Sequence, residues 1–489
     1  MKLKPLLPYL IIALALGLRL AALLRYGDFW SDEMFSFVYS QKPLIPSLTK
    51  FWLWETNPPL HLAVLKIWFV LIPANEWTAR LPSIIFGTAG VAAIYYSAKT
   101  FFTEKVALLA ALAAALAPMV IFFSATARVY ALLFLLAILS AHFTVQLFLT
   151  DTNNDRRTIF VYMLIQLLGM YAHLTFFFLL AAETATILIL RRAKIWVWIK
   201  LHLLPFALWL VWAVPAFTIK LSQRNFQNSW FFNMQIGLAT KFEQLKLIFT
   251  GPSNNIFAVI IMAVLITAVA RELIIQKRQA SIQEIFLVYL ILAMTPLILA
   301  IVLGAINIKF LFIATPAILL LTGYLLRRVP TMVATIIIIL IMVPGISQLF
   351  YHNLPINRWQ DLSAYSADKY NANKKQLIIY NNFTIKNELE YYYHGPISIL
   401  AFAPDSEDDW DYYLINNNYK SLRYTDDAIL RWLKTIGYVT YDDIYILDGI
   451  FHHEETARVL GKNGYTSANA PYYLPILEHP SLVHFSKTI

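Results

Sequence analysis

The chain has 489 residues, of which 59% are hydrophobic and 14% are charged. Soluble domains contain roughly 45–50% apolar and about 25% charged residues, so this composition excludes an ordinary soluble protein and indicates a polytopic membrane protein. The sequence has no cysteine, which excludes disulfides, cysteine nucleophiles and thiolate metal sites.

The net charge of +10 is unevenly distributed along the chain. From residue 351 onward there are 12 Lys and Arg against 17 Asp and Glu, a net charge of −5, so the first 350 residues carry +15. Basic loops that face anionic lipid explain this excess, and nucleic-acid binding is not implied.

The first apolar run, residues 5–24, contains a single charge, Arg19, and is long enough to cross a bilayer as a retained helical anchor. An outer loop at 25–59 follows. The next apolar run, 60–72, is so short that we expect a helix in the membrane interface. Ten further spans bring the predicted total to about eleven transmembrane helices, at 80–101, 106–123, 126–149, 158–178, 176–190, 195–215, 254–271, 284–305, 309–326 and 331–350.

The run from 158 to 190 would overshoot the bilayer as one helix, so we expect two antiparallel helices that meet near His173. The basic hairpins Arg191-Arg192-Ala193-Lys194 and Arg327-Arg328 favour a cytoplasmic N-terminus by the positive-inside rule. An odd number of spans then places the C-terminal region outside the cytoplasmic membrane.

Residues 351–489 differ in character, with short apolar runs and many Asp, Asn and Tyr residues. We expect strands at 376–380 and 444–447 and helices at 384–393 and 426–436, an alternation that predicts a small α/β domain. The predicted organisation is a transmembrane domain followed by an extracytoplasmic α/β domain. Their boundaries are 1–350, with outer loops 25–59 and 216–253 (the latter containing Trp230-Phe231-Phe232), and 351–489.

Polar residues gather at the outer ends of the predicted helices. They are Asp32 and Glu33 after the first helix, Asn57 before two prolines, Arg128, Tyr130, His173 and Lys309. Each has a plain alternative explanation. The acidic pair can form a solvated loop, the two cations can snorkel to lipid phosphates, and His173 can be structural. Glu183, inside a span, can simply pair with a neighbouring helix.

Together these groups provide a base, cations and aromatic rings at a membrane surface. Glycosyl transfer from a lipid-linked sugar needs such parts. A carboxylate takes the proton of the attacking hydroxyl, and Arg, Lys or a divalent metal stabilises the phosphate that leaves. Because nucleotide sugars are not expected outside the cell membrane, an outward-facing transferase needs a lipid-linked donor.

Several short motifs occur in the same order as in a known family. They are Leu18-Arg19-Leu20, Trp30-Ser31-Asp32-Glu33, Asn57-Pro58-Pro59-Leu60, Ala79-Arg80-Leu81-Pro82-Ser83 with Gly87, Ser124-Ala125-Thr126-Ala127-Arg128-Val129-Tyr130-Ala131-Leu132, Tyr171-Ala172-His173 and Lys309-Phe310. Over most of residues 15–325 this ordered set resembles the GT-C membrane glycosyltransferases. The nearest group comprises the protein O-mannosyltransferases, aminoarabinose transferases and rhizobial core transferases.

The resemblance implies that Asp32, with Glu33 beside it, is the catalytic base, and that Arg128 and Lys309 contact the donor phosphate. The substrate-binding residues that it implies also include Asn57, Arg80, Tyr130 and His173. Two departures matter. Thr126 stands where the group usually has an acidic residue, which weakens the case for a tightly bound metal. Lys309-Phe310 replaces an Arg-Tyr pair, which keeps the charge but loses the bidentate geometry.

The predicted function is an inverting glycosyltransferase at the outer face of the cytoplasmic membrane. Its donor is a polyprenyl-phosphate-linked sugar, and its acceptor is an envelope lipid, glycan or protein. No cofactor is certain, although a divalent metal is compatible with this chemistry. The alternative is a transporter or flippase for lipid-linked saccharides, which favours internal repeats and broken helices near the midplane. Neither feature is evident in the sequence.

Overall fold

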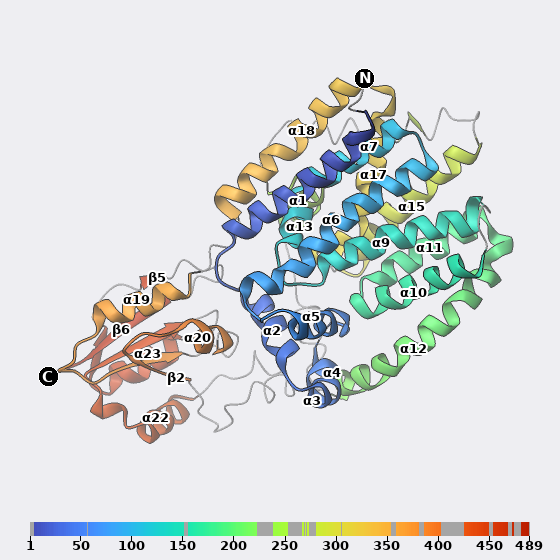
Figure 1. The fold of residues 1–489 in the computed structure, drawn as a ribbon. Helices are drawn as coiled ribbons and strands as arrows, with labels where there is room; N and C mark the ends of the chain where they lie inside the picture. Colours follow the sequence, from blue (N-terminus) through green and yellow to red (C-terminus); the bar gives the residue numbers. More distant parts are fainter. Residues whose placement is uncertain are drawn as a thin grey trace. The chain divides into compact units, whose positions relative to one another are not determined.

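In the computed structural model the chain forms two compact units. The first comprises Met1–Arg25, Ser40–Lys220 and Asn228–Leu354, and the second comprises Tyr26–Tyr39, Leu221–Gln227 and Pro355–Ile489. Figure 1 traces the chain through both units. The structure describes residues 4–55, 57–150, 155–222, 238–252, 267, 269, 271–272, 280–304, 306–353, 358–380, 386–401, 425–448, 453–467, 472–473 and 481–488.

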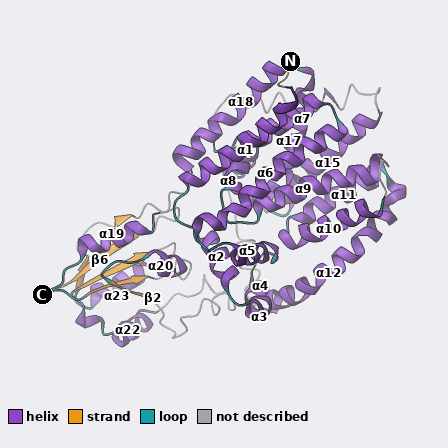
Figure 2. Cartoon of the chain, in the orientation of Figure 1, coloured by secondary structure: helices purple, strands orange, loops and turns teal. Residues whose placement is uncertain are grey.

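The described part of the first unit contains helices and no strand (Figure 2). Short 3-10 and π turns extend or join several of these helices. The α-helices are α1 (Leu7–Arg25), α3 (Leu44–Pro46), α4 (Trp52–Trp54), α5 (Leu60–Leu71), α6 (Glu76–Phe101), α7 (Glu104–Leu116), α8 (Pro118–Ser124), α9 (Tyr130–Val145), α10 (Arg156–Ala172), α11 (Phe176–Leu190), α12 (Ile195–Ser222), α13 (Leu238–Thr250), α15 (Ala280–Val302), α16 (Ile308–Leu311), α17 (Thr315–Leu325) and α18 (Thr331–Gln348).

Within the described ranges, seven helices are long and apolar enough to cross a membrane, or eight if α7 and α8 count as one span. The chain is therefore a multi-pass membrane protein. The short apolar run at 60–72 forms α5, whose twelve residues rise about 18 Å, well short of a bilayer core of about 30 Å. The predicted span 254–271 lies largely outside the described residues, and Trp230-Phe231-Phe232 lies wholly outside them.

The predicted loop at 216–253 is partly helical, which corrects the sequence-based prediction. The last turns of α12 reach Ser222, and α13 occupies Leu238–Thr250. Apolar residues recur in α13 at the spacing of one helix face, so the helical signal is present in the sequence. They are Leu238, Phe242, Leu245 and Ile248.

The predicted span 106–123 is broken, which is a second correction. The two parts, α7 and α8, meet at an angle of 59°. Pro118 lacks an amide hydrogen and disfavours helical geometry in the residue before it, and Ala117 accordingly has an extended ψ of 116°. The next helix begins at Tyr130 rather than 126, and residues 125–129 form a turn.

Close packing explains one glycine of the family-like motifs. A methyl group on Gly87 of α6 would lie 1.9 Å from Oγ of Ser124 in α8, so a side chain at this position would clash. Ser124 Oγ also accepts a hydrogen bond at 3.2 Å from Nε of Arg19, which is fully buried in α1. Gly87, Ser124 and Arg19 therefore join three helices and give a guanidinium inside the bundle a polar partner.

A buried carboxylate links four other helices. Glu183 of α11 is fully buried and accepts hydrogen bonds from Ser140 of α9 and from Tyr162 and Gln166 of α10, the last two at 3.1 and 3.3 Å. Nε2 of His202, in α12, lies 4.0 Å from the same carboxylate. Glu183 thus pairs with neighbouring helices, which is the structural alternative raised by the sequence.

The second unit contains a six-stranded mixed sheet of order β2-β1-β3-β6-β4, with β5 paired to β6. β2, β1 and β3 are parallel, whereas β6 runs antiparallel to β3 and β4. The strands are β1 (Gln376–Tyr380), β2 (Ser398–Ala401), β3 (Asp443–Asp448), β4 (Tyr465–Ser467), β5 (Tyr472–Tyr473) and β6 (Ser481–Lys487), and the helices are α2 (Ser31–Gln41, whose last residues belong to the first unit), α19 (Gln360–Lys369), α20 (Lys386–Tyr392), α22 (Asp426–Thr435) and α23 (His453–Lys462).

The predicted α/β region is therefore present. β1 and β3 occupy the two predicted strand positions, and α20 and α22 occupy the two predicted helix positions. All five residues of β1 are buried, which matches an apolar central strand covered on both faces.

Candidate active site

Arg128 lies in the turn that joins α8 to α9. The Thr126 hydroxyl donates to the carbonyl of Phe123 at 3.1 Å, and Ser83 Oγ of α6 donates to the carbonyl of Arg128 at 3.2 Å. Thr126, which replaces the acidic residue of the related group, is fully buried and closes this turn. Arg128 is only 8% exposed, so its guanidinium extends from a backbone that is fixed on both sides.

His173 lies in the short connection between α10 and α11 and is buried. Its Nδ1 accepts the backbone N–H of Thr175 at 3.1 Å, so the proton of the neutral imidazole is on Nε2, which is then a donor. Burial, together with the charges of Arg128 and Lys309, lowers the pKa of His173 to about 3. The ring is therefore neutral near pH 7, with both cations close to it.

Lys309 is the second residue of the helical turn α16, which follows the predicted outer connection. Asn307 caps this turn, because its Oδ1 accepts the backbone N–H of Lys309 at 2.9 Å. The preceding backbone N–H, of Ile308, donates to Oε1 of Gln244 in α13 at 2.8 Å. Lys309 is thus placed by a capped turn anchored to a second helix.

Aromatic rings complete the group around His173. The ring of Tyr130 lies 5.8 Å and that of Phe310 lies 6.2 Å from the imidazole. The charges of Arg128 and Lys309 also act on the same imidazole. The structure therefore brings together four of the residues singled out from the sequence: Arg128, Tyr130, His173 and Lys309.

His61 belongs to the same group, and the sequence analysis missed it. It lies in the first turn of α5 and is 6% exposed. Burial and the charge of Arg128 lower its pKa to about 3. Its Nε2 is buried and has no hydrogen-bond partner in the part of the chain that the structure describes. Such an atom costs about 1–3 kcal/mol unless something binds it, which is what a ligand site offers.

The sequence feature that could have identified His61 is its position, four residues after Asn57 and at the start of an apolar run. Asn57 itself closes the turn before α5. Its side-chain amide and its backbone N–H donate to Oε1 of Glu55 at 3.1 and 3.2 Å. Asn57 therefore stabilises the turn that precedes α5.

Arg80 is 2% exposed near the start of α6. It precedes Ser83 by three residues and therefore shares a helix face with the hydroxyl that holds the Arg128 turn.

Asp32 and Glu33 belong to the second unit. The sequence places them in an outer loop, but both lie in the first turn of α2. Carboxylates in a first turn offset the positive end of the helix dipole, which favours a helix start at Ser31. Glu33 is fully buried and Asp32 is half-buried, so the two adjacent carboxylates have different surroundings.

The two units thus supply different chemistry. The first offers two cations and two neutral imidazoles, a set that suits a phosphate without needing a change of protonation. The second offers a half-buried carboxylate on a helix. Across the described ranges, no group of three or more His, Cys, Asp or Glu is placed to hold a metal ion.

Residues 56–218 match the family model described as dolichyl-phosphate-mannose-protein mannosyltransferase. Among solved structures, ArnT from Cupriavidus metallidurans in the apo state is 15% identical, with 97% of each chain covered and a TM-score of 0.60. The same protein bound to undecaprenyl phosphate is 14% identical, with the same coverage and a TM-score of 0.57. The Archaeoglobus fulgidus oligosaccharyltransferase in complex with Zn and sulfate is 10% identical over 99% of this chain and 73% of that chain, with a TM-score of 0.52.

At such low identities these structures establish the fold alone. The sequence evidence is the match of residues 56–218 to the family model. A search of curated proteins found no match. The shared fold and the description of the matched segment both agree with a resemblance to the GT-C membrane glycosyltransferases. This confirms the resemblance predicted from the motifs and, with it, the expectation of a glycosyltransferase.

Proposed function

We propose that this protein transfers a sugar from a polyprenyl-phosphate donor to an envelope lipid, glycan or protein at the outer face of the cytoplasmic membrane. The family description and the solved structures support the donor class. One ArnT structure is bound to undecaprenyl phosphate, and one structure of the Archaeoglobus fulgidus oligosaccharyltransferase AglB holds a dolichol-phosphate and an inhibitory peptide. The acceptor is proposed from the outward-facing topology.

In the proposed reaction an acceptor hydroxyl attacks the anomeric carbon of the sugar. The new bond forms from the acceptor oxygen as the bond from carbon to the phosphate oxygen breaks, which inverts the configuration. Asp32 takes the hydroxyl proton, and the electron pair of the broken bond leaves with the polyprenyl phosphate. Arg128 and Lys309 stabilise the charge that develops on that phosphate.

The observation that carries this proposal is the group formed by Arg128, Lys309, His61 and His173. Cations that merely snorkel to lipid need no buried imidazoles beside them. Here both imidazoles are buried, and the positive charge of Arg128 lowers the pKa of both. Nε2 of His173 is a donor, and Nε2 of His61 has no hydrogen-bond partner within the described chain. These features support binding of a phosphate headgroup.

The proposal includes the topology expected from the sequence. Eleven spans with the N-terminus inside place the ends of α1, α8, α10 and α15 outside, together with the connections that carry Arg128, His173 and Lys309. The C-terminal α/β domain is then extracytoplasmic. The two domains are proposed as a glycosyltransferase domain at 1–350, whose outer connections at 25–59 and 216–253 contain helices, and an outer domain at 351–489.

Binding of undecaprenyl phosphate by the purified protein tests the phosphate contacts without a known sugar or acceptor. We expect Arg128→Ala and Lys309→Ala each to weaken binding about ten- to hundredfold, since each removes a charge-assisted contact of roughly 1.5–3 kcal/mol. Lys200→Ala, which removes an exposed lysine of α12, is the control and should bind as the wild type does. Unchanged binding by both site variants would indicate that these cations only snorkel to lipid phosphates.

A further inference from the structure

The second unit joins two parts of the chain that are distant in sequence. Tyr26–Tyr39 clusters with Pro355–Ile489 rather than with the helices that flank it in the chain. The contacts that make this join lie immediately before α2 and on its first two turns. They involve α19 and α20 of the C-terminal domain.

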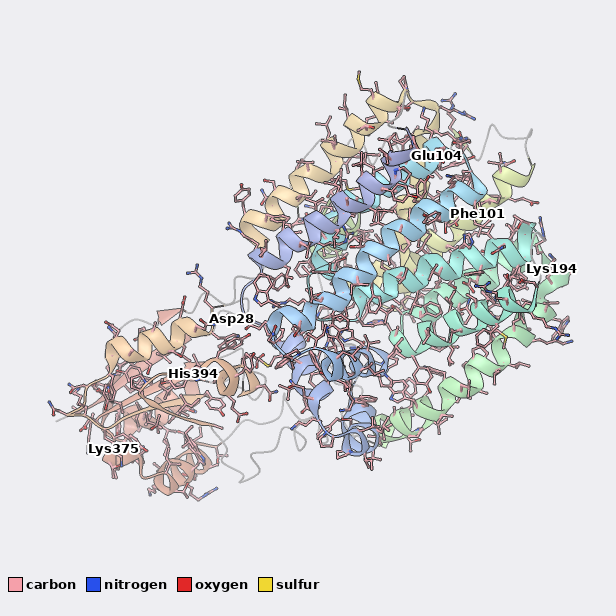
Figure 3. All side chains as sticks on the ribbon, viewed as in Figure 1. Asp28, Phe101, Glu104, Lys194, Lys375 and His394 are labelled. Carbon is pink, nitrogen blue, oxygen red and sulfur yellow. The ribbon has the colours of Figure 1, made fainter. Side chains whose placement is uncertain are left out.

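Two backbone-level contacts hold the residues before α2. The buried N–H of Phe29 donates to the hydroxyl oxygen of Tyr392, in α20, at 2.8 Å, across 363 positions of sequence. The carboxylate of Asp28 accepts the backbone N–H of Gln360, the first residue of α19, at 3.3 Å. This carboxylate therefore lies at the positive end of α19. Figure 3 labels Asp28 beside these helices.

Aromatic contacts hold α2 at a residue that follows Asp32 in the sequence. Phe37 of α2 lies 5.0 Å from Phe29 and 5.5 Å from Tyr391, ring centre to ring centre, and the Tyr391 contact is edge-on. Tyr391 also reaches Phe29 at 6.5 Å. Contacts with the C-terminal domain therefore flank Asp32. One is made by Phe29, three residues before it, and another by Phe37, five residues after it.

The surface that makes these contacts is itself fixed. Ser363 Oγ of α19 donates to the carbonyl of Tyr392 at 3.3 Å and accepts the N–H of His394 at 2.9 Å. A methyl group on Gly395 would lie 2.6 Å from Ser366 Oγ, so α19 and the end of α20 are in close contact. The hydroxyl of Tyr392 thus projects from a backbone held by a second helix.

From these contacts we infer that the C-terminal α/β domain positions the base. Tyr392 and Tyr391 are positioning residues that hold the start of α2, so that the carboxylate of Asp32 keeps one orientation. This inference rests on the proposed role of Asp32. It assigns to the domain a task that the resemblance to the family leaves open.

Tyr392→Phe tests the inference, because it removes the hydroxyl that accepts the Phe29 N–H and keeps the ring. We expect kcat for sugar transfer to fall about three- to tenfold, with KM for the lipid donor unchanged. Hydrogen exchange in the peptide 26–39 should accelerate. In an Asp32→Asn background the same substitution should cause no further loss, because the two residues act as one unit.

Tyr465→Phe is the matched control. The hydroxyl of Tyr465 donates to the carbonyls of Tyr438 and Tyr441, both at 2.7 Å, within the same domain. It should lower the melting temperature without changing kcat or the exchange of 26–39. Tyr391→Leu, which removes the ring contacts, is a second test variant with the same expected signature as Tyr392→Phe.

Three results would overturn the inference. They are unchanged exchange and kcat in both test variants, an equal fall of kcat in Tyr465→Phe, and a full additive loss in the Asp32→Asn background. The exchange measurement needs no activity. Full transfer by Asp32→Asn alone would refute the base instead, so failure of the proposed function is recognised separately.

Discussion

His61 and His173 are two neutral imidazoles beside two cations, and this arrangement has a chemical use. A neutral imidazole can donate an N–H to a phosphate oxygen without adding positive charge, so the positive charge of this group comes from Arg128 and Lys309. The depressed pKa values of both rings keep this state constant across pH 5–8. Transfer activity should therefore show no inflection from either histidine in that range.

The same pKa values predict how stability depends on pH. The folded pKa of His61 is about 3, below the usual value of 6.5, so the unfolded chain binds more protons between these values and stability falls as pH drops below 6.5. The slope approaches about 1.4 kcal/mol per pH unit for each such histidine. His61→Phe should flatten the loss of melting temperature between pH 6.5 and 4.5. The wild-type slope in that variant would contradict a buried, neutral His61.

Single residues could be predicted where their chemistry is unusual for their place in the sequence. Arg128 and Lys309 were found because cations at helix ends in a membrane protein demand an explanation. His61 was missed because a histidine beside an apolar run is ordinary. It is distinguished by its burial and by its Nε2, which has no hydrogen-bond partner among the described residues. The structural importance of Gly87 depends on an approach between helices that sequence does not reveal.

At the scale of elements, apolar run length was the reliable signal. It predicted the division of 158–190 into α10 and α11 and the short helix α5. It failed where a local effect interrupts or extends a helix. Pro118 breaks the span after Leu116, and the acidic pair at 32–33 begins α2 instead of forming a loop. Both effects are visible in the sequence, but neither changes mean hydropathy.

At the scale of the whole molecule, the fold class followed from composition, and the C-terminal α/β region followed from a change in pattern. The grouping of Tyr26–Tyr39 with the C-terminal residues could not be predicted from the sequence, because it depends on contacts such as that of Phe29 with Tyr392. No local pattern encodes a pairing over such a distance. This is why the role proposed for the C-terminal domain could be argued only from the structure.

Membrane topology is a prediction about the whole molecule, and the absence of cysteine makes it simple to test. Ser467→Cys, at the exposed end of β4, should react with an impermeant maleimide in intact spheroplasts. Ala193→Cys, in the basic connection before α12, should react only after the membrane is opened. Labelling of Ala193→Cys alone in intact spheroplasts would reverse the orientation and move the proposed site to the inner face.

The central claim is that Asp32 accepts the proton during sugar transfer, and one comparison tests it most directly. Asp32→Asn and Glu33→Gln are assayed in membranes supplied with labelled lipid-linked sugar, with undecaprenyl phosphate binding measured in parallel. Asp32→Asn should lose about 10²–10⁴-fold in transfer while keeping phosphate binding, and Glu33→Gln should lose less. Full transfer by Asp32→Asn would contradict the account, whether or not Glu33→Gln is active.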